Sequence, residues 1–251
     1  ICMGNNQAGE ENRTGIPKDD TAVGGSKVDR SKIMLVFDYD GTIQETMKIY
    51  APAVLDMAKR LRNIYGYRVE NPGYARMESW LGLRNEEMWE DFAPALSADA
   101  RAAAAARVAA YMRALVREGV DPWYSGTREI LDKLKAEGYR MMILSNSDHE
   151  YADFNRDSFE TDKWFERYVD CESWDWQSKA DVLSSIIADN PEMTYVMIGD
   201  RFNDREAAVK NHILFIACDY GYARAGELDE ADARAHSIEE LPEIIARLTD
   251  Y

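Results

Sequence analysis

Four apolar runs that each end in a polar or acidic residue constrain the fold of this chain more than any other feature. The runs are KIMLVFD, ending at Asp38; YRMMILSNSD, which turns polar at Ser145; TYVMIGD, ending at Asp200; and ILFIACD, ending at Asp219. Runs of this length that are apolar on both faces are typical of central strands in a parallel sheet. A weaker strand is predicted in RYVDCE, residues 167–172.

Helical patterns lie before and between the last three of these runs. TREILDKLKAEG repeats its apolar residues at helical spacing and ends at Gly138, and similar patterns cover residues 179–190 and 204–212. Strands that alternate with helices predict right-handed βαβ units and a doubly wound parallel sheet. The expected fold class is therefore α/β, with a Rossmann-like core.

Residues 47–121 do not follow this alternation, because they contain helical patterns without a convincing strand. The helical patterns of this segment cover residues 52–66, 85–93 and 99–119. The segment therefore predicts an inserted α-helical cap domain, and residues 32–46 and 122–251 make up the α/β core. Residues 1–31 are polar and glycine-rich, which predicts a flexible leader.

The charge of the chain excludes some partners. A net charge of -16 disfavours binding to nucleic acid and to an anionic membrane surface. No run approaches the ~18 apolar residues that span a bilayer.

The cysteines, Cys2, Cys171 and Cys218, lie far apart, which favours free thiols in a reducing cytoplasm. The three histidines are equally scattered, so a zinc site made of His and Cys is not expected.

The polar strand ends predict a functional site. Ligands of an open α/β sheet bind beyond the carboxyl ends of its strands, so Asp38, Ser145 and Asp200 should lie at one edge. Asp40 and Asp204 follow two of these ends closely, which brings four carboxylates together. Their repulsion calls for a hard cation such as Mg²⁺. A strand-end aspartate can attack phosphorus, and a second one two residues later can act on the leaving oxygen.

Four stretches carry these residues in a fixed order: FDYDGTI, ILSNS, WQSKADVL and IGDRFND. In order and separation they are similar to the four motifs of the haloacid dehalogenase superfamily, on its phosphatase branch. The match covers about residues 32–250, and the helical insertion lies where the family has its helical cap. Glu45 stands where many members have an aspartate. Residues 215–245 resemble the phosphoglycolate-phosphatase-like members.

This resemblance implies a role for each motif residue. Asp38 would be the nucleophile, and Asp40 would be the general acid and base. Ser145 would hydrogen-bond the phosphoryl group that is transferred. Lys179 would neutralise both that group and the nucleophile.

The resemblance also implies a Mg²⁺ site made up of Asp38, Asp40, Asp200 and Asp204, with Asp40 contributing its backbone carbonyl. Four carboxylates, one lysine and one Mg²⁺ leave a single net negative charge before a substrate binds. A dianionic phosphate then favours protonation of one acid, which suits Asp40 as the proton donor.

Candidate substrate contacts are less specific. Thr42 and Asn146 lie inside the motifs and are predicted to bind the substrate. Arg84, in the cap stretch WLGLRNEEMW, could clamp a substrate carboxylate or phosphate, or could be a surface arginine in a helix–helix turn. Linkers at residues 45–49 and 120–124 would let the cap close over the site.

The expected activity is that of a Mg²⁺-dependent phosphatase. It would hydrolyse a small phosphorylated metabolite, such as phosphoglycolate, through an aspartyl-phosphate, and act as a monomer or homodimer in the cytoplasm. One alternative is a sugar phosphomutase of the β-phosphoglucomutase kind, which shares the core motifs and the cap. Another is a catalytically silent binding protein of the same fold. A 2-haloacid dehalogenase is disfavoured, because that branch lacks an acid at the position of Asp40.

Overall fold

The computed structural model describes residues 28–250 of the chain, and these residues form a six-stranded parallel sheet. The strands are β1 (Ile33–Phe37), β2 (Arg140–Ser145), β3 (Tyr168–Asp170), β4 (Thr194–Gly199), β5 (Leu214–Cys218) and β6 (Ala233–Ala235). Their order is β3-β2-β1-β4-β5-β6, and every neighbouring pair is parallel. The doubly wound sheet is thus confirmed. The strand order reverses beside β1, where sheets of this kind have their ligand crevice.

Helices cover both faces of the sheet because its central strands are apolar on both sides. The core helices are α5 (Thr127–Ala136), α6 (His149–Phe159), α7 (Lys179–Asp189), α8 (Phe202–Asn211) and α9 (Leu241–Thr249). Leu35 and Phe37 of β1 pack in one apolar cluster with α5 and α9, and Met34 and Val36 pack in another with α7 and α8. Fully burying such a side chain contributes roughly 1.5–3 kcal/mol, so the apolar run itself secures β1 at the centre.

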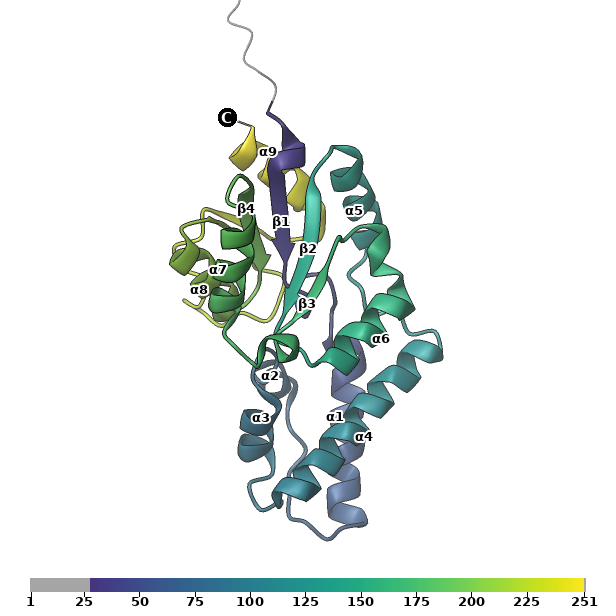
Figure 1. Cartoon of the computed structure of the whole chain (residues 1–251). Coiled ribbons are helices and arrows are strands. Elements are labelled where there is room, and N and C mark those ends of the chain that lie inside the picture. The colour runs from purple at the N-terminus through teal and green to yellow at the C-terminus, as the bar shows by residue number, and fades with distance from the viewer. Residues whose placement is uncertain (1–27, 251) are drawn as a thin grey trace, which may run out of the picture.

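Four helices form the insertion between β1 and β2. They are α1 (Met47–Asn63), α2 (Tyr74–Glu78), α3 (Asn85–Phe92) and α4 (Ala98–Arg117). Figure 1 shows them below the sheet, beyond the carboxyl end of β1. Their apolar side chains make a cluster of their own, which includes Met57, Leu61 and Trp89. The helical insertion predicted from the sequence is therefore present and lies over the carboxyl edge of the sheet.

The chain enters and leaves this insertion at neighbouring points. Gln44 and Trp123 form an antiparallel bridge. The backbone N–H of Glu45 donates a hydrogen bond to the carbonyl of Pro122 over 2.8 Å. The two connecting segments therefore lie side by side.

Most of the predicted leader, residues 1–31, lies outside the described residues. Its last part packs on the core: Arg30, in a 3-10 turn (Arg30–Lys32), forms ion pairs with Glu137 at 2.9 Å and with Asp250 at 2.6 Å. Further 3-10 turns lie at Thr161–Lys163, Glu172–Trp174 and Ile238–Glu240. Within residues 28–250, no helix combines the length and the apolar character needed to cross a bilayer.

Candidate active site

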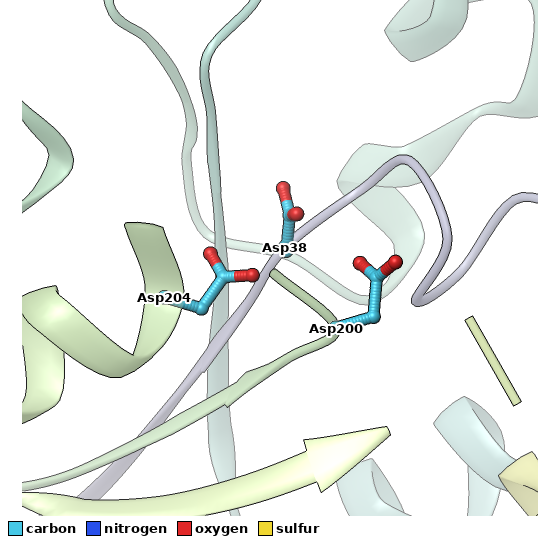
Figure 2. A group of neighbouring side chains, drawn as sticks. All are labelled: Asp38, Asp200 and Asp204. Carbon is cyan, nitrogen blue, oxygen red and sulfur yellow. The ribbon is translucent and has the colours of Figure 1, made fainter. Parts of the chain in front are cut away.

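Three carboxylates come together at the carboxyl edge of the sheet. Asp38 directly follows β1, Asp200 directly follows β4, and Asp204 lies in the first turn of α8. Each offers an oxygen atom within 4.8 Å of the other two, and all three residues are buried. Figure 2 shows the three carboxylates extending to the same side of the chain. The strand ends thus gather acids from distant parts of the sequence, as the apolar runs predicted.

Glycines make room for two of these carboxylates. Gly41 has a φ of +85°, which glycine adopts without strain, and a Cβ at this position would overlap the carboxylate of Asp200. A Cβ on Gly221 would also overlap Asp200, and one on Gly199 would overlap Asp204. The glycines of DGT and GD are therefore required by the packing of the acids themselves.

Hydrogen bonds fix the orientation of the same two acids. Asp200 accepts one from the Thr42 hydroxyl over 3.3 Å and one from the Tyr222 backbone N–H over 2.7 Å. Asp204 accepts one from the Arg201 backbone N–H over 2.9 Å. Thr42, a predicted substrate contact, is fully buried, and its hydroxyl is engaged with Asp200.

Lys179, the first residue of α7, lies between two of the acids. Its Nζ is 2.6 Å from Oδ1 of Asp38 and 2.6 Å from Oδ1 of Asp204, and the side chain is almost completely buried. Burial alone would lower the pKa of Lys179, but the charges of Asp204 and Asp38 outweigh it and hold the pKa above its usual value. Lys179 therefore keeps its positive charge at neutral pH.

The three carboxylates still outnumber this one cation. Burial, reinforced by the charge of Asp38, raises the pKa of Asp204 to about 7. Burial, followed by the charges of Asp38 and Asp204, also raises the pKa of Asp200 well above its usual range. A divalent cation would relieve this repulsion, and a donor set made only of carboxylates suits a hard ion such as Mg²⁺. The residues present therefore fit a bound Mg²⁺.

The carboxylate of Asp40 does not belong to this group and is bonded to other side chains. Its Oδ1 accepts hydrogen bonds from the Thr46 hydroxyl over 2.5 Å, the Tyr151 hydroxyl over 2.7 Å and the Gln44 amide over 3.3 Å. Burial raises the pKa of Asp40, although these donors and the charge of Lys179 act in the opposite direction. A raised pKa brings a carboxyl group closer to the pH range in which a general acid is most effective.

A cavity of about 220 Å³ lies between the core and the helical insertion. Asp38, Asp40, Ser145 and Lys179 line it on the core side. Residues of α1, α3 and α4 form a largely apolar wall: Tyr50, Met88, Ala105, Val108, Ala109 and Met112. A phosphate ester could therefore place its phosphoryl group against Asp38 and its remaining atoms against the insertion.

Two of the predicted substrate contacts also line this cavity. Arg84 precedes α3; its side chain is 66% exposed, and it makes a long ion pair of 3.5 Å with Glu87. The side-chain oxygen of Asn146 accepts a hydrogen bond from the Cys171 thiol over 3.2 Å. Arg84 and Asn146 thus share one cavity with Asp38, whereas Thr42 does not line it.

Sequence reasoning assigned no catalytic or binding role to Thr46, Tyr151 or Arg201, which the structure places in the cavity wall. Arg201 joins the core to the insertion, because its guanidinium donates a hydrogen bond to the Leu81 carbonyl and pairs with Glu227 at 2.7 Å. Arg201 is a positively charged residue within the acidic stretch GDRFND, and this feature of the sequence could have indicated a role for it. Tyr151 had no such signal, because it belongs to a helix that the sequence pattern did not predict.

The sequence matches one known family. Residues 35–218 match the model of a family described as haloacid dehalogenase-like hydrolase. No curated protein sequence matches the chain significantly.

Many solved structures have a similar fold, and three of them serve as examples. A predicted phosphoglycolate phosphatase from Haemophilus somnus aligns over 84% of this chain and 97% of its own, with a TM-score of 0.72 and 16% identity. A haloacid dehalogenase-like family protein from Streptococcus pneumoniae aligns over 86% and 99%, with a TM-score of 0.67 and 21% identity. CbbY from Rhodobacter sphaeroides, solved in complex with phosphate, aligns over 85% and 96%, with a TM-score of 0.65 and 18% identity.

Proposed function

This chain belongs to the haloacid dehalogenase-like hydrolases, and from that premise we propose that it is a Mg²⁺-dependent phosphatase acting on a small phosphorylated metabolite. The observation that carries the proposal is the placement of Asp38 and Asp40 in one cavity wall, with Lys179 2.6 Å from Asp38. These groups supply the nucleophile, the proton donor and the counter-charge for phosphoryl transfer. The similar fold of a predicted phosphoglycolate phosphatase supports a small acid phosphate as the leading candidate substrate.

In the first step, the carboxylate of Asp38 attacks the phosphorus of the ester. A bond forms between an Asp38 oxygen and phosphorus, the bond from phosphorus to the alcohol oxygen breaks, and Asp40 gives its proton to that oxygen. Lys179 balances the negative charge that Asp38 and the phosphoryl group share. The hydroxyl of Ser145, at the end of β2, donates a hydrogen bond to a phosphoryl oxygen. The step leaves a free alcohol and an aspartyl-phosphate on Asp38.

In the second step, water hydrolyses the aspartyl-phosphate. Asp40, now ionised, takes a proton from the water as the water oxygen attacks phosphorus, and the bond from phosphorus to Asp38 breaks. Inorganic phosphate leaves, and Asp40 is protonated again. A Mg²⁺ held by Asp38, Asp200, Asp204 and the Asp40 carbonyl would supply positive charge for the acids and the phosphoryl oxygens.

A panel of phosphorylated metabolites, assayed for released phosphate in the presence of Mg²⁺, tests this function. The panel contains phosphoglycolate, several sugar phosphates and an aryl phosphate. We expect phosphate release from at least one small metabolite. A sugar phosphomutase would instead interconvert sugar phosphate isomers and release little phosphate. A binding protein would give no reaction at all. Isomer interconversion with little phosphate release, or the absence of any reaction, would contradict the proposal.

We expect Asp40→Asn to slow turnover by about 10²–10⁴-fold, because an amide can neither give nor take the catalytic proton. The loss in kcat/KM, which reports the first step, should be smaller for 4-nitrophenyl phosphate than for an alkyl phosphate, because nitrophenolate leaves without being protonated. Steady-state kinetics on the two esters measures the difference. Equal losses on both esters would contradict a proton-donating role.

Replacing Arg84 tests its predicted contact with the substrate. Because its side chain is 66% exposed, water weakens such a contact, and we expect Arg84→Ala to lower kcat/KM for phosphoglycolate by about fivefold, or about 1 kcal/mol. An aryl phosphate without a second anionic group should be unaffected. Arg107→Ala is the matched control, because Arg107 lies in α4, is half exposed and does not line the cavity. Similar effects of the two variants would contradict a specific contact by Arg84.

We also propose that residues 47–121 form a mobile cap over a core made of residues 32–46 and 122–251. The adjacent entry and exit segments support this, because they could bend together as one hinge. Two side chains of the GDRFND stretch contact the cap: Arg201 donates to the Leu81 carbonyl, and Asn203 donates to the Gly82 carbonyl over 3.4 Å. Closure would shield the aspartyl-phosphate from bulk water.

A reducing compartment such as the cytoplasm suits the cysteines that the structure describes. Cys171 and Cys218 are free thiols and are buried. Burial raises the pKa of Cys171 to about 11, so its thiol stays protonated and unreactive. Cys2 lies outside the described residues.

A further inference from the structure

The hydrogen bonds to Asp40 are distributed unequally between its two carboxylate oxygens. Thr46, Tyr151 and Gln44 all donate to Oδ1, at 2.5, 2.7 and 3.3 Å. Within residues 28–250, no group donates a hydrogen bond to Oδ2. A carboxylate oxygen offers two lone-pair directions, and the two short hydrogen bonds, from Thr46 and Tyr151, already occupy both of them on Oδ1. A proton placed on Oδ1 would have to displace one of these donors.

Tyr151 is held so that its hydroxyl proton points to Asp40. Its backbone N–H donates to the side chain of Asp148 over 2.7 Å, which fixes Tyr151 in the first turn of α6. Its ring packs edge-on against Tyr39, with ring centres 6.3 Å apart. The Gln44 amide donates to the Tyr151 oxygen over 2.7 Å, so that oxygen is engaged as an acceptor and its own proton is free for Asp40.

From this geometry we propose that Tyr151 is a positioning residue that, together with Thr46, occupies Oδ1 of Asp40 and leaves Oδ2 as the atom that carries the catalytic proton. The inference rests on the proposed phosphatase function. In the first step the proton moves from Oδ2 to the alcohol oxygen as the phosphorus–oxygen bond breaks. In the second step the attacking water returns a proton to Oδ2. Tyr151 keeps its own proton throughout, because it acts only through Asp40.

The effect of Tyr151→Phe on two substrates tests this role. The variant keeps the ring and removes only the hydroxyl. We expect kcat/KM for n-butyl phosphate to fall by about 10- to 100-fold, the range for a hydrogen bond to a charged group, and kcat/KM for 4-nitrophenyl phosphate to fall by less than about threefold. KM should change little for either ester. Tyr139→Phe is the matched control: Tyr139 is also buried, its hydroxyl contacts Thr249 at 3.0 Å far from the site, and its variant should keep wild-type kinetics.

A double variant separates positioning from a general structural effect. In the Asp40→Asn background, Tyr151→Phe should cost less than about threefold on n-butyl phosphate, because its contribution passes through Asp40. Equal losses on the two esters in the single variant, or the full single-variant loss in the Asp40→Asn background, would overturn the inference and leave the phosphatase function standing. A wild-type protein that hydrolyses no ester would overturn both.

If Tyr151→Phe unfolds below the assay temperature, the variant Gln44→Met tests the same proposal. Gln44→Met removes the donor that turns the Tyr151 hydroxyl toward Asp40, so it should show the same substrate pattern and the same lack of effect in the Asp40→Asn background. A loss that is independent of leaving group and of Asp40 would overturn the proposal by this route as well.

Discussion

We expect Asp38→Asn to lower kcat by at least about 10⁴-fold. A neutral amide is a poor nucleophile toward phosphorus and a poor ligand for a hard cation. The fold should survive, because the amide has nearly the same shape and the substitution removes one charge from three crowded carboxylates. Lys179 keeps its ion pair of 2.6 Å with Asp204. Phosphate release and a thermal melt measure the two effects.

Asp219→Asn is the matched control for this prediction. Asp219 also directly follows a strand, β5, and pairs with Arg234 at 3.4 Å, but it does not line the cavity. Its variant should turn over like the wild-type protein. Activity of Asp38→Asn above about 0.01% of wild type, in a preparation free of the wild-type protein, would contradict its role as nucleophile.

Excess EDTA is expected to reduce turnover to the background rate, and added Mg²⁺ to restore it. Ca²⁺ should restore little, because it prefers more ligands at longer distances and would hold the carboxylates in a different geometry. Mg²⁺ should also stabilise the fold, by about 2.7 kcal/mol at a concentration 100 times its Kd, because it relieves the repulsion among buried acids. Assays in a metal-free buffer and thermal melts with and without Mg²⁺ measure these effects.

Asp200→Asn tests whether the group made up of Asp38, Asp200 and Asp204 is the site at which Mg²⁺ acts. Asp200 is fully buried and is held by the hydroxyl of Thr42 and the backbone of Tyr222. Its variant should lose both turnover and the stabilisation by Mg²⁺. Full activity of the wild-type protein in excess EDTA would contradict the proposed metal site.

The parts of the fold and site that could be predicted are those encoded in local patterns. The four apolar runs became β1, β2, β4 and β5, because burial on both faces demands continuous apolar residues, and the weaker stretch RYVDCE became β3. The placement of Asp38, Ser145 and Asp200 at one edge followed from the direction of parallel strands alone. Strand β6 escaped prediction, because its three residues include the exposed Arg234 and form no apolar run.

The parts that could not be predicted depend on contacts between distant residues. Tyr151 reaches Asp40 across 111 positions of sequence, and Arg201 reaches Leu81 across 120. The periodicity of apolar residues along the sequence does not indicate such pairs, because each pair depends on how α6 and the cap pack on the sheet. Thr42 is a similar case: its place in the DGT motif suggested a substrate contact, but only the packing shows that its hydroxyl is directed at Asp200.

The entry and exit of the helical insertion lie side by side, and from this we infer that the insertion could be exchanged as a unit. Because the backbone N–H of Glu45 is hydrogen-bonded to the Pro122 carbonyl over 2.8 Å, another insertion could replace the residues between Thr46 and Pro122 without disturbing the order of the sheet. The acids and the lysine of the proposed reaction belong to the core, while most of the apolar cavity wall belongs to the insertion. Exchange of the helical insertion could therefore give the same catalytic residues a new substrate.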